Sequence, residues 1–199
     1  MEIGIIGFGR FGKLLTKYLS KDFKVYVSSR SNKDDDIKKN NGIPASIEDA
    51  CSKDVVIPCV PISKFKETLN EIKGMLKDNS LVIDVCSVKE YPVKLMKELL
   101  PKKVQILATH PMFGPDSAAE SLKGNKIALC KIRIDDKKYE KIKSYLKEKG
   151  LIVIETTPEK HDMESAKSLL LTHFIGRALI DFGSTSMEID TEGYKKLMK

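Results

Sequence analysis

The sequence lacks several features that mark particular classes of protein. No apolar run approaches the roughly 18–20 residues that a membrane span requires. A strand-like pattern begins at Glu2 and leaves no room for a signal peptide, so we expect a cytoplasmic protein. No CxxC pair occurs, which disfavours both a metal site and a disulfide framework. The cysteines are widely spaced, at Cys51, Cys59, Cys86 and Cys130.

Arginine is also scarce, although the net charge is +7. A nucleic-acid-binding protein would gather basic side chains on one face and would favour arginine. Here the lysines are spread over nearly every predicted helix and alternate with Asp and Glu, as on a solvated surface. We therefore expect neither a nucleic-acid nor a membrane partner. The four arginines are Arg10, Arg30, Arg133 and Arg177.

Short apolar runs alternate with helical periodicity through the first 155 residues. This alternation predicts βαβ units and a mostly parallel sheet with helices on both faces. The predicted helices span about 10–20, 63–77, 92–99 and 136–149. The predicted strands span residues 2–7, 23–29, 54–60, 81–86, 104–109, 126–134 and 151–155.

The pattern changes after residue 155. Thr157 and Pro158 are typical of a helix N-cap followed by proline at the first helical position. A long helix is predicted from there to about Ile180, and its apolar residues cover more than one face. Such a surface favours burial against a partner. We therefore expect residues 156–199 to be a short helical segment for substrate binding and dimerisation, and the protein to be a homodimer.

A glycine motif, Gly7-Phe8-Gly9-Arg10-Phe11-Gly12, follows the first strand and opens the first helix. In this context the first glycine permits a tight turn, the second admits a pyrophosphate close to the backbone, and the third lets helix and strand pack closely. The unpaired N–H groups of the helix favour the anion. The first 155 residues are therefore predicted to be a Rossmann-type, doubly wound nucleotide-binding domain.

The end of the second strand indicates which nicotinamide cofactor binds. An NAD-binding protein would have Asp or Glu here, whereas this chain has Ser29, Arg30 and Ser31. An arginine between hydroxyl groups suits the 2′-phosphate of NADP. A solvated loop arginine is the alternative. Val60-Pro61 ends the third strand at the same sheet edge, where it is either a cofactor contact or a plain loop start.

The three histidines, His110, His161 and His173, lie in the later half of the chain. His110 ends the fifth predicted strand, and the proline after it favours an extended backbone. We expect His110 to stand on a rigid loop at the carboxyl edge of the sheet. A purely structural histidine is equally compatible with this pattern.

Three motifs in order resemble the signatures of prephenate and arogenate dehydrogenases. They are Asp84-Val85-Cys86-Ser87-Val88-Lys89, the run HPMFGPDS at 110–117, and His161-Asp162 together with the run LTHFIGR at 171–177. The glycine motif and SSRS are similar to those of NADP-using arogenate dehydrogenases. The resemblance covers essentially the whole chain.

The resemblance implies a role for each matching residue. His110 would take a proton from the ring hydroxyl of the substrate, Ser87 would bond to that hydroxyl and orient His110, and His173 would lie in the substrate pocket. His161, with Asp162, would be a structural element of that pocket. Arg177 lies one helical turn after His173 and could bind a substrate carboxylate; an interhelix or interface salt bridge is the alternative.

The chain is shorter after the nucleotide domain than is usual for the family, and it has no arginine after Arg177. Two other functions therefore stay open. One is a different NADP-dependent reductase on the same scaffold, and the other is a truncated relative that binds NADP without turnover. The sequence does not choose between prephenate and arogenate as the substrate.

Overall fold

The computed structural model describes residues 1–198 and comprises two compact units, residues 1–162 and the residues from 163 onward. The first unit is an α/β structure built on one eight-stranded sheet, in the order β3-β2-β1-β4-β5-β6-β7-β8. Among the described strands only β6 and β7 pair antiparallel, so the predicted mostly parallel sheet is confirmed. The strands are β1 (Glu2–Ile6), β2 (Lys24–Ser28), β3 (Ile43–Pro44), β4 (Val55–Pro58), β5 (Leu81–Asp84), β6 (Gln105–Pro111), β7 (Lys126–Arg133) and β8 (Ile152–Glu155).

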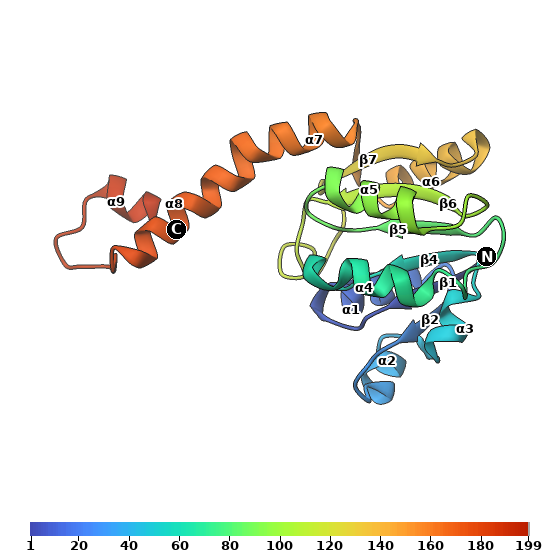
Figure 1. The fold of residues 1–199 in the computed structure, drawn as a ribbon. Coiled ribbons are helices and arrows are strands. Elements are labelled where there is room, and N and C mark those ends of the chain that lie inside the picture. Colours follow the sequence, from blue (N-terminus) through green and yellow to red (C-terminus); the bar gives the residue numbers. More distant parts are fainter. Residues whose placement is uncertain (199) are drawn as a thin grey trace. The chain divides into compact units, whose positions relative to one another are not determined.

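Helices cover both faces of this sheet (Figure 1). One buried cluster joins the sheet to α3 (Ile47–Cys51), α4 (Ile62–Ile72) and α5 (Glu90–Leu99). The other joins the opposite face to α1 (Arg10–Leu19), α2 (Asp34–Lys39) and α6 (Asp136–Glu148). The four longer helices were predicted from their periodicity, whereas α2, β3 and α3 were not predicted.

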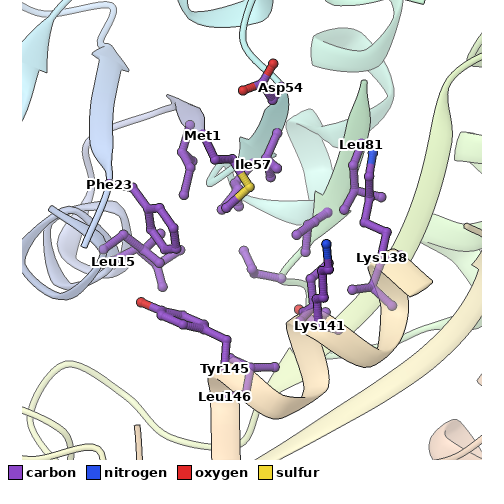
Figure 2. A pocket seen from close by; sticks show the side chains of 18 of the residues that line it. Met1, Leu15, Phe23, Asp54, Ile57, Leu81, Lys138, Lys141, Tyr145 and Leu146 are labelled. Atoms are coloured by element: carbon purple, nitrogen blue, oxygen red, sulfur yellow. The ribbon is translucent and has the colours of Figure 1, made fainter. Parts of the chain in front are cut away.

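A cavity of about 760 Å³ lies on the sheet face between α1 and α6 (Figure 2). Its walls are mainly apolar, with Leu15 and Phe23 on one side and Tyr145 and Leu146 of α6 on the other. Neither the glycine motif nor Arg30 lines it. The cavity is therefore separate from the loop at which the sequence predicts a nucleotide.

Helical structure begins again at α7 (Pro158–Ser165), where the Lys160 N–H donates to Thr157 Oγ1 at 3.2 Å, as the predicted N-cap requires. The second unit contains a π-helical segment (Ala166–Leu170), α8 (Leu171–Asp181) and α9 (Glu192–Leu197). Helix is therefore present throughout the range predicted for the long helix. Within residues 1–198, no helix is long and apolar enough to span a membrane.

Candidate active site at the carboxyl edge of the sheet

The glycine motif has the geometry that a bound pyrophosphate needs. Gly7 has φ of +103°, a conformation that other residues rarely adopt, and an added Cβ would lie 2.5 Å from the Cys59 carbonyl oxygen. An added Cβ on Gly12 would lie 2.2 Å from the Gly7 carbonyl oxygen, so helix and strand pack without room for a side chain. At Gly9, which caps α1, no atom lies within 4 Å of an added Cβ. The loop thus leaves open space beside the helix N-terminus, where an anion can approach.

A cavity of about 560 Å³ adjoins this loop, lined by Gly7, Phe8 and Gly9, by Ser29, Arg30 and Ser31, and by Val60 and Pro61. The structure therefore brings these predicted residues together at one site. Two further cations, Lys33 and Lys64, line the same cavity and were missed by the sequence analysis. A hydrogen bond from Lys64, its charge and the charge of Arg30 lower the pKa of the Glu67 carboxyl. Three cations, Arg30, Lys33 and Lys64, thus line the cavity together with two carboxylates, Glu67 and Glu71.

The side chains of Arg10 and Phe11, two other residues of the glycine motif, contact the loop that follows β6. The Arg10 guanidinium forms an ion pair of 2.6 Å with Asp116, and the Phe11 ring centroid lies 6.4 Å from that of Phe113. Neither residue lines the cavity beside the glycine loop. Their side chains instead join the start of α1 to the loop that follows β6.

His110 lies within β6, paired with Ala128 of β7, and not on a loop as predicted. The strand extends to Pro111 because proline keeps the backbone extended and β7 supplies a partner. His110 is 6% exposed, and its Nδ1 lies 2.8 Å from Nε2 of His161. Burial, with smaller contributions from His161 and Lys89, lowers the pKa of His110 to about 4. His110 is therefore neutral near pH 7.

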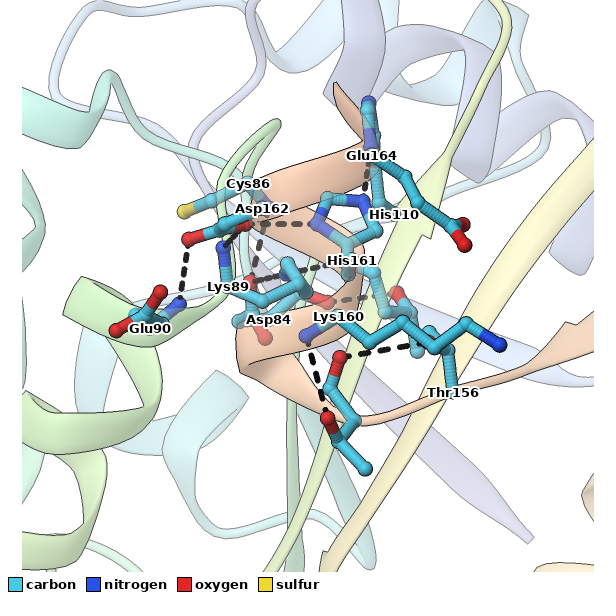
Figure 3. A network of polar contacts seen from close by, with 12 residues as sticks. Asp84, Cys86, Lys89, Glu90, His110, Thr156, Lys160, His161, Asp162 and Glu164 are labelled. Carbon is cyan, nitrogen blue, oxygen red and sulfur yellow. Dashed lines mark hydrogen bonds and ion pairs between the residues drawn. The ribbon is translucent and has the colours of Figure 1, made fainter. Parts of the chain in front are cut away.

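Asp162 continues this contact beyond His161 (Figure 3). Asp162 Oδ1 lies 2.7 Å from His161 Nδ1 and accepts the Lys89 N–H at 2.7 Å. Asp162 Oδ2 accepts the Glu90 N–H at 2.9 Å, so the carboxylate also satisfies the N-terminus of α5. Burial raises the pKa of Asp162, but the hydrogen bonds from Glu90, His161 and Lys89 outweigh it and lower that pKa. Asp162 is therefore an ionised acceptor.

A buried ion pair between Lys89 and Asp84 lies beneath this network. The Lys89 ammonium also donates to the Thr109 carbonyl, and the Thr109 hydroxyl donates to the Asp84 carbonyl at 2.7 Å. Burial raises the pKa of Asp84 even though Lys89 opposes the effect. These bonds tie the ends of β5 and β6 together one residue before His110. Asp84 and Lys89 belong to the first of the three motifs, but their pairing was not predicted from the sequence.

The remaining predicted site residues are exposed. Ser87 is exposed in the loop after β5, and in the described part of the chain it makes no hydrogen bond to His110. His173 and Arg177 lie on α8 in the second unit, both exposed. Arg177 pairs with Asp181 one turn later in the same helix, at 3.1 Å, which is neither a substrate contact nor the interhelix or interface salt bridge of the alternative.

Residues 15–155 match the family described as "Prephenate dehydrogenase, nucleotide-binding domain". The chain belongs to this family. The neighbouring solved structures, which share the Rossmann-type fold, include A. aeolicus prephenate dehydrogenase in complex with hydroxyphenyl propionate and NAD+. That structure aligns with a TM-score of 0.78 at 24% identity, over 100% of this chain and 77% of its own.

Two curated relatives come from Arabidopsis thaliana. The chain is 36% identical over 211 residues to arogenate dehydrogenase 2, chloroplastic, covering 100% of this chain and 58% of that protein. It is 35% identical over 210 residues to arogenate dehydrogenase 1, chloroplastic, covering 100% of this chain and 33% of that protein. The chain thus spans between 33% and 58% of the length of these two relatives.

Proposed function

We propose that this member of the prephenate dehydrogenase family is an enzyme that oxidatively decarboxylates arogenate or prephenate with NADP, a step of tyrosine biosynthesis. The observation that carries the proposal is the buried, neutral His110 at the end of β6, on the same carboxyl edge of the sheet as the glycine loop after β1. Ligands of open α/β sheets bind at this edge. The names of the curated relatives supply the substrate class.

NADP is supported by the charge around the nucleotide cavity. Arg30 has Ser29 and Ser31 on either side, and Lys33 and Lys64 line the same space. A 2′-phosphate would find charge-assisted donors there, and no carboxylate replaces Arg30 at the end of β2. The A. aeolicus relative was solved with NAD+, so the choice of cofactor in this chain depends on these cations.

The chemistry assigns the proton to His110. A bound nicotinamide would accept the hydride from the substrate's ring carbon. Nε2 of His110 would accept the proton of the hydroxyl group that this carbon bears. The substrate carboxylate would leave as carbon dioxide, and the ring would become aromatic. A positioned general base typically contributes about 10²–10⁴-fold to the rate. Ser87, exposed beside the same sheet edge, would contact the hydroxyl only once substrate is bound.

The test is to incubate the full chain with NADP and either substrate and to follow the reduced cofactor by its absorbance. The wild type should turn over at least one substrate, and His110→Asn should bind NADP normally but turn over about 10²–10⁴-fold more slowly. Normal turnover by the variant would remove His110 from the mechanism. Binding of NADP without turnover of either substrate would favour a different reductase or a non-catalytic relative.

We also propose that the second unit binds substrate and forms a homodimer. His173 and Arg177 are the proposed substrate contacts there, with Arg177 exchanging its Asp181 partner for a substrate carboxylate. The dimer is supported by large apolar side chains on this unit that are more than half exposed, namely Leu170, Leu171, Phe174, Ile180 and Phe182. Light scattering at micromolar concentration should give twice the 22.3 kDa of the chain, and a monomeric mass would contradict the proposal. The four free cysteines accord with a reducing compartment such as the cytoplasm.

A further inference from the structure

His161 has no ring nitrogen left for a substrate. Its Nε2 contacts His110 at 2.8 Å and its Nδ1 contacts Asp162 at 2.7 Å, and the side chain is 4% exposed. The resemblance implied that His161 belongs to the substrate pocket, whereas in the structure its Nε2 is occupied by the contact with His110. A role exerted through His110 therefore fits its position better than contact with the substrate.

The ionised state of Asp162 determines which ring nitrogens of His161 and His110 carry a hydrogen. Its ionised carboxylate can only accept, so Nδ1 of His161 carries a hydrogen. An imidazole that carries its hydrogen on Nδ1 has a lone pair on Nε2, so Nε2 of His161 can accept the Nδ1–H of His110, which is neutral. His110 is consequently left with a bare lone pair on Nε2, the nitrogen that must accept the substrate proton.

The main-chain contacts of Asp162 keep this arrangement in place. The carboxylate is fixed by the N–H groups of Lys89 and Glu90 at the start of α5, at 2.7 and 2.9 Å. Because these donors belong to the backbone, they cannot rotate away or titrate. The carboxylate therefore holds one orientation toward His161.

We propose that His161 and Asp162 are positioning residues that hold His110 as the Nδ1–H tautomer and take up the positive charge formed when Nε2 accepts the substrate proton. As Nε2 of His110 gains that proton, its Nδ1 proton passes to Nε2 of His161. His110 stays neutral, and His161 becomes an imidazolium paired directly with Asp162. The extra charge thus rests beside a carboxylate, whereas on His110 it would be opposed by the Lys89 ammonium. The proton transfer rests on the proposed function, whereas the tautomer of His110 does not.

The first arm of the test needs neither cofactor nor substrate. In the ¹⁵N NMR spectrum of the full chain near neutral pH, His110 should show a protonated Nδ1 and an unprotonated Nε2. In Asp162→Asn, the side-chain amide can donate to Nδ1 of His161, which reverses both rings and places the His110 proton on Nε2. A wild-type His110 that carries its proton on Nε2 would overturn the proposal.

The second arm measures turnover in Asp162→Asn. The reversed tautomer blocks the base, so kcat should fall by about 10²–10⁴-fold while the KM for NADP stays within about two-fold. Asp135→Asn is the matched control, because Asp135 also accepts a backbone N–H at a helix start, that of Lys138 in α6, and is far in sequence from the network. This control should keep wild-type kcat.

The outcomes separate the two hypotheses. A kcat in Asp162→Asn within about three-fold of the wild type would overturn the positioning role. An equal loss in Asp135→Asn would do so as well, because it would show that the effect comes from lost helix capping. Absence of turnover in the wild type would reject the proposed function, and the NMR arm would still decide the tautomer.

Discussion

The low pKa of His110 predicts a specific loss of stability in mild acid. The pKa falls from the ordinary 6.5 to about 4 because the ring is buried and faces His161 and Lys89, with only Asp162 opposing. The folded state therefore binds fewer protons than the unfolded state between these values. The stabilising contribution is complete above pH 6.5 and is lost as the pH falls toward about 4.

The magnitude follows from the same two values. Each pKa unit corresponds to ~1.4 kcal/mol, so the protonated ring is disfavoured in the fold by ~3 kcal/mol. Between about pH 7 and about pH 5 only part of this free energy is lost from the stability of the fold, and the loss due to His110 alone is ~2 kcal/mol.

Urea unfolding at these two pH values measures the effect. The wild type should lose ~2 kcal/mol more on acidification than His110→Asn, because every other titrating group is shared by the two proteins. The slopes against urea should agree, so that both unfold the same surface. If the two proteins lost equal stability to within ~0.5 kcal/mol, His110 would be protonated as easily in the fold as outside it, and the burial argument would be wrong.

Substitutions in the nucleotide cavity and the buried ion pair test the rest of the site. Arg30→Ala should raise the KM for NADP about ten-fold or more and leave that for NAD nearly unchanged, because only NADP has a phosphate to lose; equal effects in steady-state kinetics would reject the cofactor assignment. Gly9→Ala should keep the melting temperature but weaken NADP binding, whereas Gly12→Ala should lower the melting temperature, because its Cβ would lie 2.2 Å from the Gly7 carbonyl oxygen; calorimetry with and without NADP distinguishes the two. Lys89→Met should destabilise the protein by about 3–5 kcal/mol in urea unfolding, since it leaves a buried carboxylate without its partner; a loss below ~1 kcal/mol would contradict the importance of the pair.

The sheet was predictable because its strands are nearly continuous apolar runs between helical repeats. The runs at 54–60 and 81–86 became β4 and β5, which are buried between two helical layers. The missed elements are short: β3 has two residues and α3 has five. Segments of that length show no periodicity, and their structure depends on the sheet edge and the neighbours against which they pack.

The nucleotide loop was predictable for a different reason. Its glycines act through the backbone of consecutive residues, so the motif alone carries the geometry. Lys33 and Lys64 were missed because they enter the same cavity from different elements, α2's start and α4. Their position near Arg30 depends on the order of β2, β1 and β4 in the sheet, which no local pattern contains.

The contacts of the histidine network could not be predicted from the sequence either. The motifs directed attention to His110 and to the His161-Asp162 pair, but nothing in the sequence indicated that rings 51 residues apart share a hydrogen bond. That contact requires the first turn of α7 to pack over the end of β6. The expected partner, Ser87, belongs to the correct loop but is exposed. Local sequence therefore identified the participants, whereas tertiary packing determined which of them touch.

The burial of His110 explains why such a network is useful to a base. A histidine with the ordinary pKa is already about three-quarters neutral at pH 7, so lowering the pKa to about 4 increases the available base only slightly. The same change removes more than two orders of magnitude of basicity, which a proton acceptor needs. Burial alone would therefore make His110 a poorer base than a histidine in water. A partner that accepts the displaced proton beside a fixed carboxylate recovers the lost driving force, and His161 with Asp162 has the geometry to do so.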